Sequence, residues 1–178
     1  MTLSYALQFP EDVSGLVTLG CAMYKEGYPA ENGDILSKIV TTPVVGDIIM
    51  NTLLATPLGK SMGRVTTKQT FSPEEPPDGY EEKLLAMWGR PRQFKANRED
   101  ILAFPKTSKE LSPYYPKIKQ PTIIVVGDKD PFGTISMAER LHKDLSNSTM
   151  IKLPNVGHMI PENHPEKVLD AIELLKTL

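Results

Sequence analysis

Two apolar runs near the end of the chain, each followed at once by a polar loop, most constrain what this sequence can fold into. Residues 122–126 and 149–153 are apolar enough to form buried strands. Residues 136–145, which lie between them, carry apolar side chains at helical spacing. Strand, helix and strand in this order favour parallel pairing through a right-handed crossover. We therefore predict an α/β fold in which both loops lie at the same edge of a sheet.

The part of the chain before these runs adds a third strand and a segment of a different kind. Residues 2–9 predict the last turns of a helix that Pro10 stops, and residues 15–19 predict another buried strand. Residues 22–120 have recurrent prolines and no strand pattern, which is typical of helices joined by turns. We predict such helices over residues 34–40, 44–54, 80–88 and 98–104.

Helix-start residues support part of this scheme. The side chains of Asp34 and Asn97 can each accept a hydrogen bond from an unpaired N–H group at the start of a helix. Together the patterns predict an α/β protein with a core made of residues 1–21 and 121–178, which holds a short parallel sheet of about three strands flanked by helices. Residues 22–120 are predicted to form a helical cap over this core. The alternative is that they form a small separate helical domain.

Composition narrows the classes of function. The net charge of the 178 residues is −2, which gives no electrostatic reason to bind nucleic acid or an anionic membrane. The single cysteine, Cys21, cannot form an internal disulfide, and we interpret it as a small buried residue of a cytoplasmic protein. The sequence has no Cys/His cluster with metal-ligand spacing. The longest apolar segment, residues 44–54, is too short and too polar to span a membrane.

The loops after the two apolar runs hold the candidate catalytic residues, Asp130 and His158. A carboxylate at Asp130 could accept from Nδ1 of His158 and leave Nε2 free to take a hydroxyl proton, as in a Ser-His-Asp relay. The alternatives are that Asp130 only stabilises its own turn and that His158 is an ordinary loop residue. We interpret Asp128 as a turn residue and His164 as a helix cap.

Taken together, these segments resemble the later part of the α/β-hydrolase superfamily. Residues 5–17 resemble the end of the helix after the nucleophile elbow and the strand that follows it. Residues 121–131 match the family's Pro-apolar-Gly-x-x-Asp pattern, and residues 156–158 resemble its histidine loop. The resemblance implies that Asp130 and His158 are the relay acid and histidine, and that no cofactor is needed. It also implies that the elbow, which precedes both, is expected upstream of the first residue, so that the usual nucleophile is missing.

One Gly-x-Ser-x-Gly string does occur, and Ser61 is at its centre. A nucleophile elbow needs this string at a sharp turn from a strand into a helix, where the hydroxyl is exposed. Ser61 instead follows a predicted helix inside the cap, where the two glycines can serve a turn or close helix packing. Ser61 is therefore the candidate nucleophile that the chain itself offers, and an ordinary cap residue is the alternative.

These inferences leave two classes of function open. The first is an esterase- or lipase-like carboxylic-ester hydrolase that acts on small apolar esters by Ser-His-Asp acyl transfer. The second is an inactive hydrolase remnant that binds a small molecule or a partner, or half of a complex that another chain completes. We expect an apolar pocket in the cap, lined by residues from its helical pieces: Ile48, Ile49, Met50, Leu53, Leu54, Met87 and Trp88.

The third predicted strand raises a question of assembly. Residues 15–19 are apolar, and the strand beside which this family would place them is expected outside the chain. An unpaired apolar edge invites pairing with another chain. We therefore expect a homo-oligomer in which a second copy covers this edge, or a different partner that does so.

Overall fold

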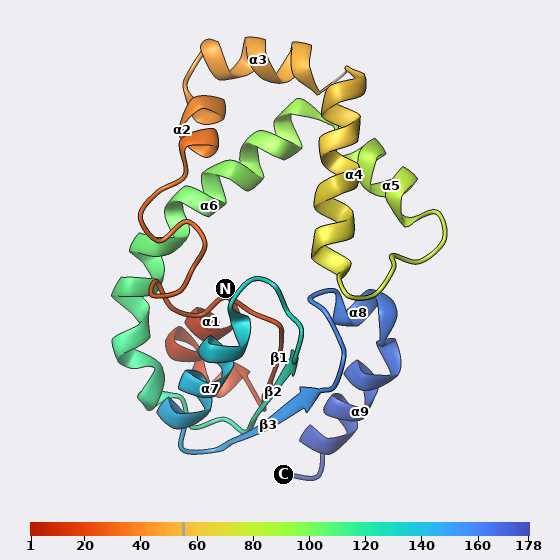
Figure 1. Cartoon of the computed structure of the whole chain (residues 1–178). Coiled ribbons are helices and arrows are strands. Elements are labelled where there is room, and N and C mark those ends of the chain that lie inside the picture. Colours follow the sequence, from red (N-terminus) through yellow and green to blue (C-terminus); the bar gives the residue numbers. More distant parts are fainter. Residues whose placement is uncertain (55) are drawn as a thin grey trace.

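A three-stranded parallel sheet lies at the base of the molecule (Figure 1), with the strand order β1-β2-β3. The structure is a computed structural model that describes residues 1–54 and 56–178. The strands are β1 (Leu16–Leu19), β2 (Thr122–Gly127) and β3 (Ser148–Leu153). Each begins and ends within one residue of its predicted bounds. The prediction of a short parallel sheet flanked by helices is therefore confirmed.

Strand β2 is the centre of the sheet because it pairs on both sides. Its residue Ile124 lies opposite Thr18 of β1 and Met150 of β3. All six residues of β2 are buried, as expected for a strand that neighbours cover on every side. Its side chains alternate between two buried clusters, so that Ile124 belongs to one and Ile123 to the other.

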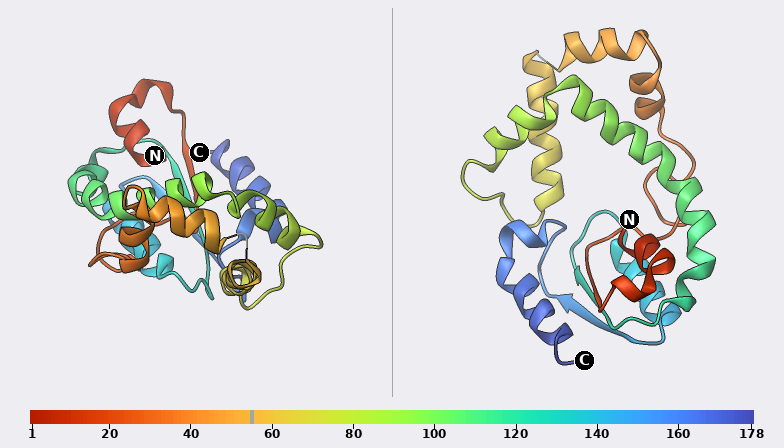
Figure 2. Two further views of the ribbon diagram at one scale, coloured as in Figure 1. Left: turned by 90° about the horizontal axis from the view of Figure 1, so that it is seen from above. Right: turned by 180° about the vertical axis from the view of Figure 1, so that it is seen from behind.

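Helices cover both faces of the sheet (Figures 1 and 2). The helices whose residues share the cluster of Ile124 are α1 (Thr2–Gln8), α7 (Thr134–Asp144) and the 3-10 helix η2 (Ser112–Lys117). The helices that share the cluster of Ile123 are α8 (Ile160–Asn163) and α9 (Pro165–Leu175). A short 3-10 helix, η1 (Pro10–Asp12), leads from α1 into β1.

The middle of the chain is helical and rises away from the sheet (Figures 1 and 2). We call residues 35–111 the helical segment. It consists of α2 (Ile35–Thr41), α3 (Val45–Leu53), α4 (Pro57–Phe71), α5 (Tyr80–Trp88) and α6 (Pro91–Leu111). The helix start at Asp34 is confirmed, because its carboxylate accepts from the backbone N–H of Leu36 at 3.1 Å.

Two predictions about the helical segment were wrong, and one alternative was decided. Helix α6 is 21 residues long, and Asn97 lies inside it rather than at its start. Its first residue is Pro91, and proline is well suited to that position because the N–H that it lacks would be unpaired there. The Gly-x-Ser-x-Gly string forms no turn, because it lies within α4. A Cβ atom at Gly63 would come within 2.7 Å of Leu85 of α5, so this glycine serves close helix packing.

The interpretation of Cys21 was also wrong. Its side chain is exposed rather than buried, and its thiol donates to the carbonyl oxygen of Leu19 at 3.4 Å. Cys21 lies two residues after Leu19, the last residue of β1. Among the helices formed by residues 1–54 and 56–178, none is both long enough and apolar enough to cross a membrane.

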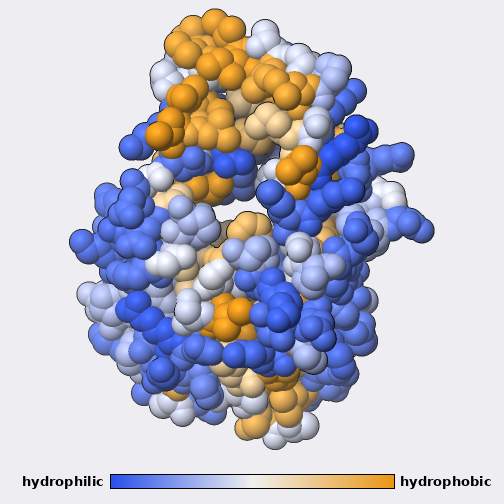
Figure 3. Space-filling view, in the orientation of Figure 1, coloured by the Kyte–Doolittle hydropathy of each residue, from blue (hydrophilic) through white to orange (hydrophobic). Residues whose placement is uncertain are grey.

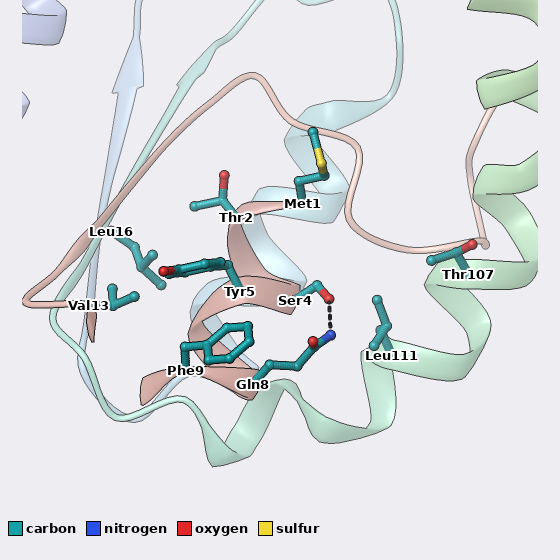
Figure 4. A pocket seen from close by; sticks show the side chains of 10 residues that line it. All are labelled: Met1, Thr2, Ser4, Tyr5, Gln8, Phe9, Val13, Leu16, Thr107 and Leu111. Atoms are coloured by element: carbon teal, nitrogen blue, oxygen red, sulfur yellow. Dashed lines mark hydrogen bonds between the residues drawn. The ribbon is translucent and has the colours of Figure 1, made fainter. Parts of the chain in front are cut away.

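Strand β1 lies at an edge of the sheet, and within the described residues it pairs with β2 alone. A groove of about 600 Å³ lies along α1 beside Leu16 of this strand (Figure 4). The rings of Tyr5 and Phe9 lie 5.1 Å apart at this groove, and each side chain is about half exposed. The free edge and the apolar groove thus lie side by side.

We expect the chain to self-associate through this groove and the edge of β1. Tyr5→Glu would put a charge in the buried centre of such a contact and should weaken association about tenfold or more. Light scattering coupled to size-exclusion chromatography over a range of concentrations measures this. Met87→Glu, at an exposed position on α5, is the matched control. A wild-type chain that stays monomeric at every concentration would contradict the expectation.

Candidate active site

The structure brings Asp130 and His158 together. Asp130 lies in the loop after β2, and His158 lies in the loop after β3. Oδ2 of Asp130 is 2.7 Å from Nδ1 of His158. The side chain of Asp130 is fully buried, whereas that of His158 is 29% exposed. The acid is thus enclosed by protein, while the imidazole reaches the surface.

This contact determines which nitrogen of His158 carries the proton. Burial raises the pKa of Asp130, but the hydrogen bond from His158 and another from the backbone N–H of Phe132 outweigh it, so that the pKa lies below its ordinary value. An ionised carboxylate only accepts hydrogen bonds, so Nδ1 must be the donor. In neutral His158 the other nitrogen, Nε2, is therefore unprotonated and can act as a base.

Close backbone contact holds the loop after β2 against the loop after β3. A Cβ atom at Gly127 would lie 2.2 Å from the carbonyl oxygen of Val156, so only glycine allows the end of β2 to approach the histidine loop this closely. The N–H of Lys129 donates to the same carbonyl oxygen at 3.0 Å. Asp128 lies in the turn after β2, as predicted, and its side chain accepts from the N–H of Asn155 in the histidine loop at 2.7 Å. The acid loop and the histidine loop therefore form one unit.

Two further residues shape the surroundings of the pair. Gly20, which follows β1, has a positive φ of +52°. A Cβ atom there would lie 3.2 Å from Oδ2 of Asp130 and 3.4 Å from Nδ1 of His158. The ring of Phe132 meets the His158 ring edge to face, with 4.8 Å between centroids. Gly20 leaves room for the hydrogen bond, and Phe132 packs against the imidazole.

Glu74 is a site residue that the sequence did not reveal. It lies between α4 and α5, and its Oε2 accepts from the backbone N–H of Gly157 at 3.1 Å. Its Oε1 is 2.7 Å from Nε2 of His164. A Cβ atom at Gly157 would lie 2.5 Å from the carbonyl oxygen of Ser72. The helical segment therefore presses directly on the loop that carries His158.

These contacts also change the roles that were expected of the neighbouring residues. His164 is the N-cap residue of helix α9, as predicted, but its side chain makes no capping hydrogen bond and binds Glu74 instead. Burial raises the pKa of Glu74, yet the hydrogen bonds from Gly157 and His164 outweigh it and leave the pKa below its ordinary value. A charged Glu74 thus ties two residues of the histidine region to the helical segment.

The structure does not bring Ser61 to this pair. Ser61 is exposed in the first turns of α4, and only the opposite end of that helix, at Phe71, contacts the histidine loop. Ten residues of α-helix separate the two positions, which corresponds to about 15 Å along the axis. Ser61 also lacks the turn from strand to helix that an elbow requires. The geometry gives no support to Ser61 as the nucleophile.

A second feature is an apolar cavity of about 310 Å³ inside the helical segment. It confirms part of the predicted pocket, since five of the seven expected residues line it: Ile49, Met50, Leu53, Leu54 and Trp88. The other two, Ile48 and Met87, are exposed on the outer surface. Among the described residues, no group of three or more His, Cys, Asp and Glu side chains could hold a metal ion.

We expect the carboxyl group of Asp130 to titrate below about 3.9, the value of an unperturbed aspartate. The pair then adds stability that is present above the unfolded pKa and is lost as the pH falls through the lower folded pKa. In His158→Ala the hydrogen bond is lost while the burial remains, so the pKa of Asp130 should rise. Carbon-13 NMR of the Asp130 carboxyl against pH measures both values. An unchanged pKa in the variant would contradict this assignment.

Glu74→Ala should lower the free energy of unfolding by about 1–3 kcal/mol, because the N–H of Gly157 is left without its acceptor. Glu75→Ala is a matched control. The side chain of Glu75 is exposed, and its backbone carbonyl, which accepts from Asn163, is kept in the variant. Urea unfolding of both variants gives the comparison. Equal stability of the two would show that Glu74 holds nothing in place.

An uncharacterized hydrolase, YugF of Bacillus subtilis (strain 168), is 28% identical over 174 residues, which cover 97% of this chain and 59% of YugF. Among solved structures, the α/β hydrolase MGS-M2 from a Medee basin deep-sea metagenome library superposes with a TM-score of 0.64 at 17% identity, covering 99% of this chain and 60% of that one. A thermophilic esterase from Thermogutta terrifontis gives 0.61 at 18% identity, covering 98% and 60%.

The structural likenesses, at these identities, show the fold, which is that of the α/β hydrolases. The chain spans about three fifths of the length of each of these relatives. The comparison with protein families adds that residues 1–177 match the Ndr family. Because this match extends over nearly the whole chain, the protein belongs to the Ndr family and, with it, to the α/β-hydrolase superfamily.

Proposed function

We propose that this chain supplies the acid and histidine of a carboxylic-ester hydrolase that acts by Ser-His-Asp acyl transfer. The observation that carries the proposal is the hydrogen bond of 2.7 Å between a fully buried Asp130 and a partly exposed His158. It leaves Nε2 as the basic nitrogen at the surface of the pair. This base lies at the carboxyl ends of parallel strands, which is where an α/β fold places reacting groups.

We propose that the nucleophilic serine comes from outside the 178 residues, because Ser61 is remote from His158. Two sources fit: a further segment of a longer protein, or another chain. The share of each relative that this chain spans, about three fifths, supports either source. The partner that we expect at the edge of β1 would then complete the site as well as the sheet.

In the proposed reaction, Nε2 of His158 takes the proton of the serine hydroxyl as the oxygen attacks the ester carbonyl carbon. A tetrahedral intermediate forms, and His158 returns the proton to the leaving alcohol as the bond from carbon to the alcohol oxygen breaks. Water then attacks the acyl-serine by the same route and releases the acid. Asp130 stays ionised throughout and stabilises the imidazolium ion that forms in each step.

A second candidate function is a binding module without catalysis. The observation that favours it is the apolar cavity of about 310 Å³, which can hold a small ligand whether or not a nucleophile is present. Under either function we propose that the ligand is small and largely apolar. The two candidates differ only in whether a serine reaches Nε2 of His158.

We also propose that the protein works in a reducing compartment such as the cytoplasm. Its one cysteine, Cys21, is exposed and has no second cysteine with which to pair. Fractionation of cells that make the protein, followed by immunodetection, tests this. Recovery from an oxidising compartment would contradict it.

The test of the hydrolase is labelling with a fluorophosphonate probe, applied to the protein as isolated with its partners from cells that make it. We expect an adduct on one serine, and His158→Ala should slow its formation about 10³-fold or more. His142→Ala, at an exposed position on α7, is the matched control and should label like the wild type.

Peptide mapping then identifies the labelled serine. A serine outside the 178 residues would support the proposal in full. An adduct on Ser61 would overturn the proposed source of the nucleophile. The absence of any adduct on the folded, assembled protein would overturn the hydrolase and leave the binding module.

A further inference from the structure

The end of the helical segment that lies farthest from the sheet carries apolar side chains on its surface (Figures 1 and 3). They come from α2, from α3 and from the N-cap residue of α3. Ile35, Val44 and Ile48 are 77%, 68% and 61% exposed, so each leaves most of its side chain uncovered. We call the group the apolar tip, and its six residues are Ile35, Leu36, Ile39, Val44, Val45 and Ile48.

Helices α2 and α3 hold these side chains close together. A Cβ atom at Gly46 would lie 1.9 Å from the carbonyl oxygen of Val40, so the start of α3 packs directly on α2. Val40 and Met50 are buried, whereas the apolar tip is formed by other residues of the same two helices. Exposed apolar side chains that gather on one surface mark a place where a protein meets a partner or a membrane.

A basic groove adjoins the apolar tip. This open groove of about 740 Å³ is lined by residues of α3 and by the start of α6, and its cations are Arg90, Arg92 and Lys95. Arg90 and Arg92 are exposed. Asp47 is the single carboxylate among the described residues that line the groove, and it pairs with Lys95 at 2.8 Å. The groove thus offers no carboxylate to the two arginines.

The groove and the apolar tip meet on α3. Ile48 belongs to the tip, and Asn51, one helical turn later, lines the groove. Helices α2 and α3 and the groove together hold four basic side chains and one acidic, a net charge of +3: Lys38, Arg90, Arg92 and Lys95, with Asp47. The whole chain carries −2. Its low net charge therefore conceals a basic region at this end of the molecule.

A second copy of the chain fits this surface poorly. Two copies that met through their apolar tips about a two-fold axis would bring their basic grooves together, and like charges would repel. Six side chains are also far fewer than the roughly 20–30 residues that each partner contributes to a stable interface. A membrane surface requires no such area. Apolar side chains beside exposed cations are the combination that binds an anionic lipid surface.

We propose that the apolar tip and the basic groove together dock the protein on a membrane surface that contains anionic phospholipids. The apolar side chains enter the boundary between head groups and acyl chains, and the guanidinium groups of Arg90 and Arg92 donate to lipid phosphates. The sheet lies at the opposite end of the molecule and stays outside the membrane (Figure 1). This docking requires neither a nucleophile nor hydrolysis, so it stands or fails separately from the proposed function.

Flotation of the full chain with lipid vesicles tests the docking. We expect the chain to float with vesicles of phosphatidylcholine that contain about one third phosphatidylserine, and far less with phosphatidylcholine alone. Raising the salt from about 0.1 M to about 1 M shortens the screening length from about 10 Å to about 3 Å, so binding should weaken.

A pair of double variants tests the basic groove. Arg90→Gln with Arg92→Gln should weaken binding to the phosphatidylserine vesicles about tenfold or more, because each cation near an anionic surface contributes several-fold. Lys117→Gln with Lys119→Gln removes the same charge from exposed positions outside the groove and is the matched control. It should bind like the wild type.

A pair of single variants tests the apolar tip. Ile48→Glu should weaken binding about tenfold or more, because it replaces an apolar side chain that enters the membrane with a charge. Leu169→Glu is the matched control, since Leu169 lies on α9 and is 62% exposed, against 61% for Ile48. Melting curves establish that each variant is folded.

A dye on the apolar tip reports insertion without relying on loss of binding. Ile48→Cys in a Cys21→Ser background carries one thiol, which is labelled with nitrobenzoxadiazole. Its emission should shift to the blue when phosphatidylserine vesicles are added, because the dye leaves water. The same dye at Leu169→Cys should not shift.

Several results would overturn the proposal. One is the absence of flotation with phosphatidylserine vesicles, and another is equal flotation with phosphatidylcholine alone. A third is an equal loss of binding in Ile48→Glu and Leu169→Glu, or a dye at Ile48→Cys that does not respond to vesicles. Loss of self-association in Ile48→Glu without any vesicle binding by the wild type would instead identify the apolar tip as an interface between copies of the chain.

Discussion

The close approach of two backbones at Gly127 is the constraint on which the rest of the site depends. Because no Cβ separates the end of β2 from the carbonyl oxygen of Val156, the loops after β2 and β3 lie against each other. Asp130 and His158 then meet, with 2.7 Å between Oδ2 and Nδ1. The parallel register of β2 with β3 places both loops at one edge of the sheet, and the glycine sets the distance between them.

The helical segment is coupled to this site through polar contacts rather than through the core. Glu74 holds the N–H of Gly157 and the side chain of His164, and Gly157 itself lies against the carbonyl oxygen of Ser72. The buried clusters around β2 contain no residue of α2 to α5 within the described chain. The position of the helical segment over the histidine loop therefore depends on a few hydrogen bonds and on the connections at its two ends.

The sequence predicted the features that follow from local patterns. Apolar runs identified all three strands, and the spacing of Asp130 and His158 after them identified the pair that the structure joins. The start of α6 was predicted wrongly because asparagine and proline both favour helix starts, and the helix begins at Pro91 rather than after Asn97. Glu74 could not have been found this way, since its partners are about 80 to 90 residues away in sequence and only the folded chain brings them near.

Because of the contact at Glu74, the helical segment is supported at both of its ends. One end joins the core where α6 continues into η2, and the other end contacts the histidine loop where α4 ends. A hollow lies between the two ends, beneath α3 (Figures 1 and 3). A segment attached at one end only can rotate about that end, whereas a segment held at both ends must first lose one of its two contacts. Release of the end at the histidine loop therefore requires the loss of the Glu74 contacts and of the hydrogen bond from Asn163 to the carbonyl oxygen of Glu75, and the same event would free the loop that carries His158.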